Sequence, residues 1–154
     1  MHTTRKSLIT LAALLALAFL ASTTAAWAQG LELGVNKEKI INGFEAELRG
    51  DYQENNGVPS RLTAELERIN IPVGTPVAFC LVDSITLVKT KLGVAKVQMV
   101  GGVPVAEIEL RTSDGDFVPK VTAGDKLQAR QSAVAPFNPN PGCGSHLLIS
   151  GKFQ

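Results

Sequence analysis

The chain is short of aromatic residues, histidine and cysteine, and each shortage removes a class of function. Aromatic residues make up 5% of the 154 residues, and the part after Ala28 holds no Trp and one Tyr, Tyr52. A sugar-binding face built on flat aromatic platforms therefore has little to use. His146 is the one histidine in that part, which limits nucleophilic and metal chemistry. No glycine-rich phosphate loop and no Asn-x-Ser/Thr sequon is present.

The first 28 residues have the organisation of a secretory signal peptide. Arg5 and Lys6 form a positive start, and a nearly continuous apolar run covers residues 8–21. That run suits a signal peptide and is short for a membrane span. Small residues ending in an Ala-x-Ala motif predict cleavage between Ala28 and Gln29. We therefore expect a periplasmic or extracellular protein, with an uncleaved N-terminal anchor as the alternative.

Cleavage changes the charge balance of the chain. The 15 basic residues lose Arg5 and Lys6, which leaves 13 against 14 acidic residues and a net charge of −1. This balance argues against nucleic acid or an anionic membrane surface as a partner, because both need a clustered basic excess. No later run is long and apolar enough for stable membrane insertion. The 126 residues that remain suffice for one domain.

The two cysteines, Cys80 and Cys143, both lie beyond the signal segment. An even count in an exported chain, without a Cys-x-x-Cys spacing, predicts one structural disulfide. The bridge would tie a late loop rich in Pro and Gly to an apolar strand at 77–82. Two buried thiols that do not meet are the alternative.

Three segments alternate between apolar and polar residues, at 44–49, 62–67 and 106–111. Such alternation predicts antiparallel strands with one buried and one solvated face. The alternation changes phase after Glu67, so a bulge or strand end is expected near Arg68. The continuous apolar run at 77–82 indicates instead a central strand, buried on both faces.

Less regular runs complete the predicted set of strands, at 85–91, 94–100, 127–130 and 147–153. Lys89, Lys91 and Lys96 would protect an exposed sheet edge from aggregation. Strands that recur about every ten residues between turn signals predict an all-β fold, a single antiparallel β-sandwich of about seven or eight strands. We place this domain at 43–154, after a loosely held lead-in at 29–42, and expect no helix beyond the cleavable signal helix.

Few side chains are candidates for chemistry. A hydrolase would have to use His146, for which an exposed loop or strand-start position is the ordinary alternative. Asp114 and Asp116 flank a glycine in a pattern that suggests a calcium loop, and Asp125 in the next turn could add a ligand. A simple β-turn explains the same pattern.

Carboxylates recur on the predicted strands, and a glycosidase would need two of them facing each other across a cleft. These residues are Glu45, Glu47, Glu65, Glu67, Glu107 and Glu109. Their place on the solvated side of alternating strands favours cross-strand pairing with Arg49, Arg61 or Arg111. We therefore predict no catalytic residue, no metal site and no cofactor.

Six short pieces of the domain share a pattern of strand and turn residues. They are FEAELRG at 44–50, NIPVGT at 70–75, AEIELRT at 106–112, GDFVP at 115–119, AGD at 123–125 and LISGKF at 148–153. Through these pieces the chain resembles a group of small exported bacterial β-sandwich proteins of unassigned function. Residues 83–102 and the Pro-rich loop before Cys143 depart from the pattern. The resemblance implies a secreted sandwich and transfers no functional residue.

The function that these features favour is an exported, non-catalytic module for binding or for interaction with the cell envelope or matrix. Its partner would be another exported protein or an envelope polymer, held by the loops at 52–60, 112–126 and 132–146. A small-molecule or ion carrier is the first alternative, and it requires an apolar pocket between the sheets. A hydrolase using His146 is the second.

Overall fold

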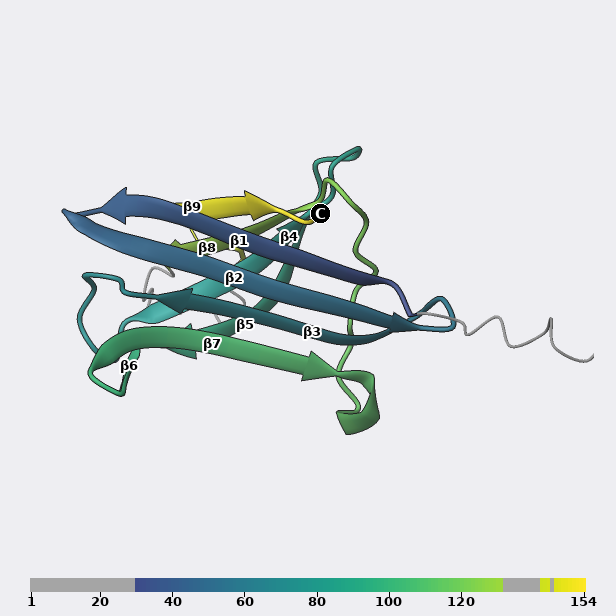
Figure 1. Cartoon of the computed structure of the whole chain (residues 1–154), viewed down its shortest axis with the longest axis horizontal. Coiled ribbons are helices and arrows are strands. Elements are labelled where there is room, and N and C mark those ends of the chain that lie inside the picture. Colours follow the sequence, from purple (N-terminus) through teal and green to yellow (C-terminus); the bar gives the residue numbers. More distant parts are fainter. Residues whose placement is uncertain (1–29, 132–141, 145) are drawn as a thin grey trace, which may run out of the picture.

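The computed structural model describes residues 30–131, 142–144 and 146–154, and these form a β-sandwich (Figure 1). The nine strands are β1 (Glu32–Ile41), β2 (Phe44–Asn55), β3 (Val58–Glu67), β4 (Pro76–Val82), β5 (Lys89–Lys96), β6 (Gln98–Val100), β7 (Val103–Arg111), β8 (Lys126–Gln131) and β9 (His146–Lys152). One 3₁₀ turn, η1 (Thr112–Asp114), follows β7. The predicted all-β class is confirmed, with slightly more strands than expected. The predicted cleavage between Ala28 and Gln29 lies outside the described residues.

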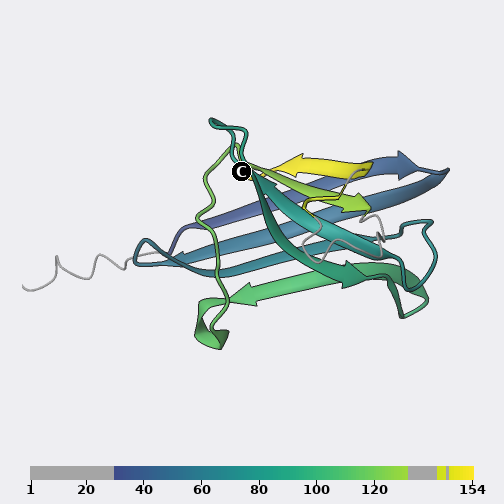
Figure 2. The same ribbon diagram turned by 180° about the vertical axis from the view of Figure 1, so that it is seen from behind.

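The strands form two antiparallel sheets. The larger sheet has the order β1-β2-β3-β7-β6, and the smaller has the order β5-β4-β8-β9. Figures 1 and 2 show the two sheets stacked as layers. They are joined at one side, where Gly34 of β1 and Gln154 after β9 exchange two backbone hydrogen bonds of 3.2 and 3.1 Å. No helix in the described part of the chain is long and apolar enough to cross a membrane.

The segment before residue 43 is a strand, which corrects the prediction of a loose lead-in. β1 pairs with β2 along its whole length. Leu33 and Val35 are buried on its inner side, but Lys37 and Lys39 follow them on the same side. Lys39 Nζ donates to the backbone oxygen of Leu148 at 3.0 Å. The lysines interrupt the apolar alternation, so the sequence pattern does not reveal the strand.

The strands predicted at 85–91 and 94–100 also need correction. Residues 84–88 form an exposed turn, and β5 runs as one strand over Lys89–Lys96 before the short β6. Asp83 Oδ1 accepts hydrogen bonds from the backbone N–H groups of Ile85 and Thr86, at 2.9 and 2.7 Å. This side-chain cap stabilises the turn against the strand preference of the β-branched residues inside it.

The core fills the space between the inner faces of the two sheets. Leu62, Ala64 and Leu66 of β3 are fully buried while the residues between them face outward, which confirms the predicted alternation. β3 ends at Glu67, and Arg68 takes a φ of 56°, so the predicted break is confirmed as well. β4 lies between β5 and β8, and its buried residues run from Val77 to Val82, as expected of a central strand.

The disulfide between Cys80 and Cys143 is confirmed, with Cα atoms 5.8 Å apart and a sequence separation of 63. Cys80 pairs with Lys91 on one side and with Gln128 on the other, in the middle of the smaller sheet. The bridge therefore holds the segment Gly142–Gly144 against that sheet.

Removing the bridge should cost a large part of the stability of the domain. Cys143→Ala leaves Cys80 in place and opens a closure of 63 residues, for which the chain-entropy model gives about 4 kcal/mol. Urea unfolding of the variant and of oxidised wild type measures the difference. Reduced wild type should match the variant, and a loss below about 1 kcal/mol would contradict the role given to the bridge.

Gly151 of β9 lies at a close approach of the two sheets. A Cβ atom added there would lie 2.5 Å from Val35 Cγ1 and 3.1 Å from Lys37 Cβ. Gly151→Ala should therefore lower the free energy of unfolding by about 1–3 kcal/mol, as overpacking does. Gly34→Ala is the matched control, because its nearest neighbour would be a backbone oxygen at 3.9 Å. Equal effects of the two substitutions on urea unfolding would contradict this account of the contact between the sheets at Gly151.

Candidate functional site

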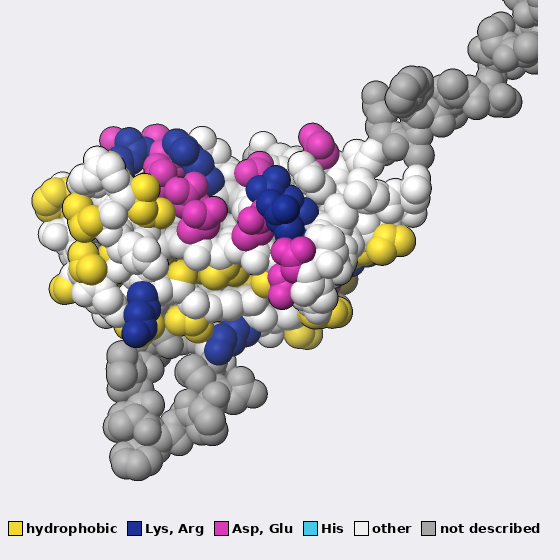
Figure 3. All heavy atoms as spheres, turned by 90° about the horizontal axis from the view of Figure 1, so that it is seen from below, with side chains coloured by type: hydrophobic (Ala, Val, Ile, Leu, Met, Phe, Trp, Pro, Cys, Tyr) yellow, Lys and Arg dark blue, Asp and Glu magenta, His cyan; other side chains and the backbone are white. Residues whose placement is uncertain are grey.

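Charged residues are divided unequally between the two sheets. The strands of the larger sheet hold ten of the 14 carboxylates of the chain, and the strands of the smaller sheet hold none. The smaller sheet carries six basic residues, namely Lys89, Lys91, Lys96, Lys126, Arg130 and Lys152. Figure 3 shows magenta and blue side chains intermixed along one side of the molecule, and only blue ones on the opposite side. The two outer faces therefore differ in chemistry.

On the larger sheet, arginines form ion pairs with several of the carboxylates. Glu109 Oε1 receives hydrogen bonds from Arg61 Nε of the next strand and from Arg111 Nη2, both at 2.7 Å. The Arg111 hydrogen bond is the main cause that lowers the pKa of Glu109, and Arg61 adds to it. The predicted cross-strand pairing is thus confirmed. Pairs as exposed as these contribute little to stability, and they offset only part of the charge of the ten carboxylates on these strands.

Glu47 lies on the same outer face, but its side chain is only 5% exposed, which corrects its predicted solvated position. Arg49 Nε donates to Glu47 Oε1 at 2.7 Å, and Arg68 Nη2 binds Oε2. The Arg49 hydrogen bond is the largest cause that lowers the pKa of Glu47, and the charge of Arg68 acts in the same direction. Arg68 reaches this position because the chain turns at the break after β3, so Glu47 is a structural carboxylate.

Three carboxylates form a like-charge cluster on this face. Glu65 of β3 lies directly opposite Glu107 of β7, and Glu67 follows two residues later on the same side. Burial, then a hydrogen bond that protonated Glu65 donates to Glu67, and the charges of its neighbours raise the pKa of Glu65 to about 7. Arg49 offsets this only in part, and it reaches Glu67 at 3.7 Å. Among the described carboxylates, this cluster most resembles the carboxylate pair that a glycosidase would need.

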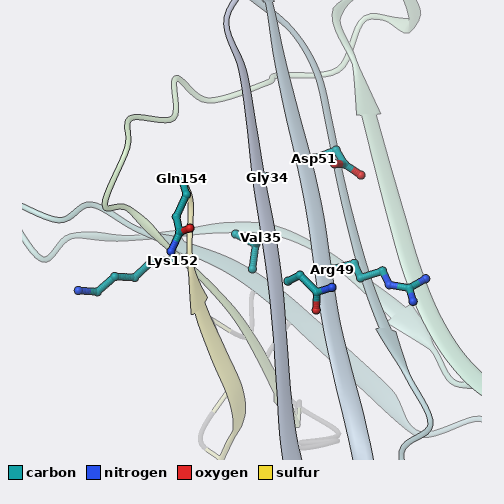
Figure 4. A pocket seen from close by; sticks show the side chains of 7 residues that line it. Gly34, Val35, Arg49, Asp51, Lys152 and Gln154 are labelled. Atoms are coloured by element: carbon teal, nitrogen blue, oxygen red, sulfur yellow. The ribbon is translucent and has the colours of Figure 1, made fainter.

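Shallow polar hollows lie on the surface of the larger sheet. One of about 430 Å³ crosses β1 at Gly34, whose missing side chain leaves the space open (Figure 4). Arg49 and Asp51 of β2 lie on one side of β1 in this view, and Lys152 lies on the other. The hollow is on the surface rather than between the sheets, so it does not supply the apolar pocket that a carrier requires.

The other candidates from the sequence are not brought together. Asp116 Oδ2 accepts from the backbone N–H of Arg111 at 3.0 Å, in the turn after β7. Asp125 is buried, and its two oxygens accept from the backbone N–H groups of Ser84 and Thr122 at 2.8 Å. Among the described residues no three His, Cys, Asp or Glu side chains could hold one metal ion. The carboxylate of Asp125 fastens two turns together instead.

His146 begins β9 opposite Gln131, and its side chain is exposed. Within the described ranges no hydrogen bond or ion pair involves it. Cys143, three residues before it, is in the disulfide and supplies no thiolate. The hydrolase hypothesis therefore gains no support from these two residues.

The lysines on the outer face of the smaller sheet have no carboxylate partner within the described part of the chain. Val82 pairs with Lys89 on one side and with Lys126 on the other, and Lys126 pairs with Lys152. Residues paired in this way point to the same face, so three lysines form one row across four strands. No described carboxylate lies within 4.0 Å of these lysines or of Lys91 and Lys96. We call this surface the lysine face.

The sequence predicted only part of the lysine face. Lys89, Lys91 and Lys96 were expected at a sheet edge, and β5 is an edge strand. Lys126 and Lys152 join them only through the pairing of β4 with β8 and of β8 with β9, which no local pattern encodes. Comparison of the chain with protein-family models, curated proteins and solved structures found no match, so the argument about function rests on this geometry.

The carboxylate cluster predicts a pH dependence of stability. Because the folded pKa of Glu65 is about 7 against an ordinary 4.5, the folded state holds the extra proton between these values. The free energy of unfolding should therefore fall as pH rises from 4.5 to 7. Glu65→Gln removes this loss. From pH 5 to pH 8, the free energy of unfolding of the variant relative to that of wild type should therefore rise by about 1 kcal/mol, allowing for solvent screening.

Urea unfolding at the two pH values measures this gain. Glu45→Gln is the matched control, because Glu45 is exposed and has no ion pair within the described residues. The same pH difference in wild type and in Glu65→Gln would show that the cluster does not act in this way.

Proposed function

We propose that the chain is an exported, non-catalytic module that binds an anionic component of the cell envelope or matrix through the lysine face. The observation that carries the proposal is the presence of six basic residues and no carboxylate on the strands of the smaller sheet. Export rests on the signal-peptide pattern, and a disulfide is compatible with it.

The contrast between the two sheets supports this choice of surface. All four arginines on or beside the larger sheet have carboxylate partners, namely Arg49, Arg61, Arg68 and Arg111. The lysines of the smaller sheet stand in a row on a rigid frame without such partners, where like charges repel one another. An anionic ligand that lies along the row would relieve this repulsion and release bound counterions.

The nature of the side chains indicates which kind of ligand fits. Lysine presents a compact charge on a flexible stem, which suits repeated phosphate or carboxylate groups better than one small ligand of fixed geometry. Strands are spaced about 4.8 Å apart, so a row across four strands spans about 15 Å. That length matches several repeats of an anionic polymer or surface, and the overall charge of −1 does not prevent such local binding.

The neighbouring segments do not neutralise the face. Residues 132–141, which connect β8 to the disulfide region, contain no charged residue. Asp83 and Asp125 lie near the lysine row and reduce its net positive charge, but neither forms an ion pair with a described lysine, and their oxygens accept hydrogen bonds from backbone N–H groups of the adjoining turns. The site proposed here is a strand face, in place of the loops expected from the sequence.

The triple variant Lys89→Gln/Lys126→Gln/Lys152→Gln tests the proposal. Binding to immobilised polygalacturonate should weaken at least about tenfold, since a lysine near an anionic surface contributes about 1 kcal/mol. Wild-type binding should also decrease steeply with salt, and neutral dextran should not bind. Retention on the two gels over a salt gradient gives the measurement.

The matched control is Arg61→Gln/Arg111→Gln/Lys120→Gln, which removes the same number of positive charges from other surfaces. It should bind like wild type, with unfolding curves confirming that both variants are folded. Equal losses in the two variants would show that net charge matters rather than the lysine face. No wild-type binding to any polyanion would refute the proposal.

A further inference from the structure

The connection between β4 and β5 displays three aliphatic side chains at the end of the lysine face. Ile85, Leu87 and Val88 are 89%, 67% and 60% exposed. Figures 1 and 2 show this connection as a teal loop that projects beyond the strand ends, close to the C-terminus. Single exposed aliphatic residues are common, but three together on a projecting turn indicate a contact surface. We call residues 85–88 the aliphatic tip.

Hydrogen bonds hold the aliphatic tip in its exposed position. The backbone N–H groups of Ile85 and Thr86 donate to Asp83 Oδ1, and that of Leu87 donates to the Asp83 backbone oxygen at 3.1 Å. The backbone N–H of Thr86, followed by that of Ile85, is the main cause that lowers the pKa of Asp83. At the base, Ser84 N–H donates to the buried Asp125 carboxylate at 2.8 Å. The tip is thus fixed rather than free to fold back onto the core.

The backbone at Leu87 is unusual for a branched residue. Its φ is 59°, in the left-handed region that Gly and Asn adopt readily and that other residues seldom do. A leucine there is strained relative to those residues, and the strain brings no buried contact, since the side chain is 67% exposed. Strained exposed positions point to a role outside the fold itself.

A row of lysines lies next to the base of the aliphatic tip, beside the carboxylates of Asp83 and Asp125. Lys89 follows Val88 directly, and the row formed by Lys89, Lys126 and Lys152 is the first row of the sheet below the turn. Aliphatic side chains flanked by lysines match the boundary of an anionic bilayer, where the former enter the acyl region and the latter reach lipid phosphates. A hydrated anionic polymer would match the lysines equally well but would leave the tip unburied.

We infer that the aliphatic tip inserts shallowly into an anionic lipid bilayer, while the row of three lysines binds the lipid headgroups. This inference rests on the proposed function, because it names the anionic component that the lysine face binds. The attachment is peripheral: one short turn enters the interface, and no helix within the described ranges spans the bilayer. The net charge of −1 argues against an anionic membrane surface as a partner if the charges are evenly spread. The strand pairing instead clusters the lysines on one sheet.

Vesicle sedimentation tests the inference with the tip variant Ile85→Ser/Leu87→Asn. Asn suits the positive φ at position 87, so this variant should fold at least as well as wild type. Wild type should bind vesicles that contain phosphatidylglycerol and should bind pure phosphatidylcholine vesicles at least tenfold more weakly. The tip variant should lose at least tenfold in affinity for the anionic vesicles while retaining its binding to polygalacturonate.

The matched control, Val58→Ser/Phe117→Ser, removes two exposed apolar side chains from other places and should bind like wild type. All forms are compared after export, in the same processed form checked by mass, so any contribution of residues 1–28 cancels. Vesicle binding that the tip variant retains, or binding to polygalacturonate without binding to vesicles, overturns this inference and leaves the proposed function standing. If the lysine triple variant binds both ligands like wild type, the proposed function fails as well.

Discussion

Every surface property of this molecule depends on the burial of one face of each sheet against the other. The inner faces meet in a core that includes Leu48, Leu66, Phe79 and Phe153. The seam closes where Gly34 and Gln154 exchange backbone hydrogen bonds, and the small side of Gly151 lets the sheets approach there. Because strand residues alternate between faces, this burial sends nearly every charged strand residue to an outer face. Which charges gather on which face is then decided by strand pairing alone.

Strand pairing produces two faces with different consequences. On the larger sheet, carboxylates and arginines from neighbouring strands satisfy one another, and even the buried Glu47 has two arginine partners. The carboxylates of this face still outnumber its basic residues, so the face repels an anionic ligand. The lysine face gains its uncompensated charge from three strands that bring no carboxylate. The strands of the two sheets therefore carry opposite net charge, and binding of an anionic ligand is expected on the lysine face.

The sequence predicts the parts of this fold that local patterns encode. Alternation located β3 and β7 and the break at Arg68, and the apolar run located β4 in the middle of its sheet. β1 was missed because Lys37 interrupts its buried side, and the turn after Asp83 was taken for a strand because its cap is a single side chain. The candidate site was out of reach for a further reason. Net charge describes the chain as a whole, whereas the lysine face forms only because the register between strands distant in sequence brings its lysines together.

The disulfide decides which part of the lysine face is open. Cys80 lies between Lys91 and Gln128 in the middle of the smaller sheet, so the bridge brings Gly142–Gly144 over its centre. There Arg130 Nε donates to the Gly144 backbone oxygen at 3.1 Å, and this guanidinium is engaged within the protein. The row through Lys126 lies toward the opposite end, next to the turn between β4 and β5. Lysines and exposed aliphatic side chains thus share one end of one sheet, and the proposed binding is expected at that end, away from the bridge.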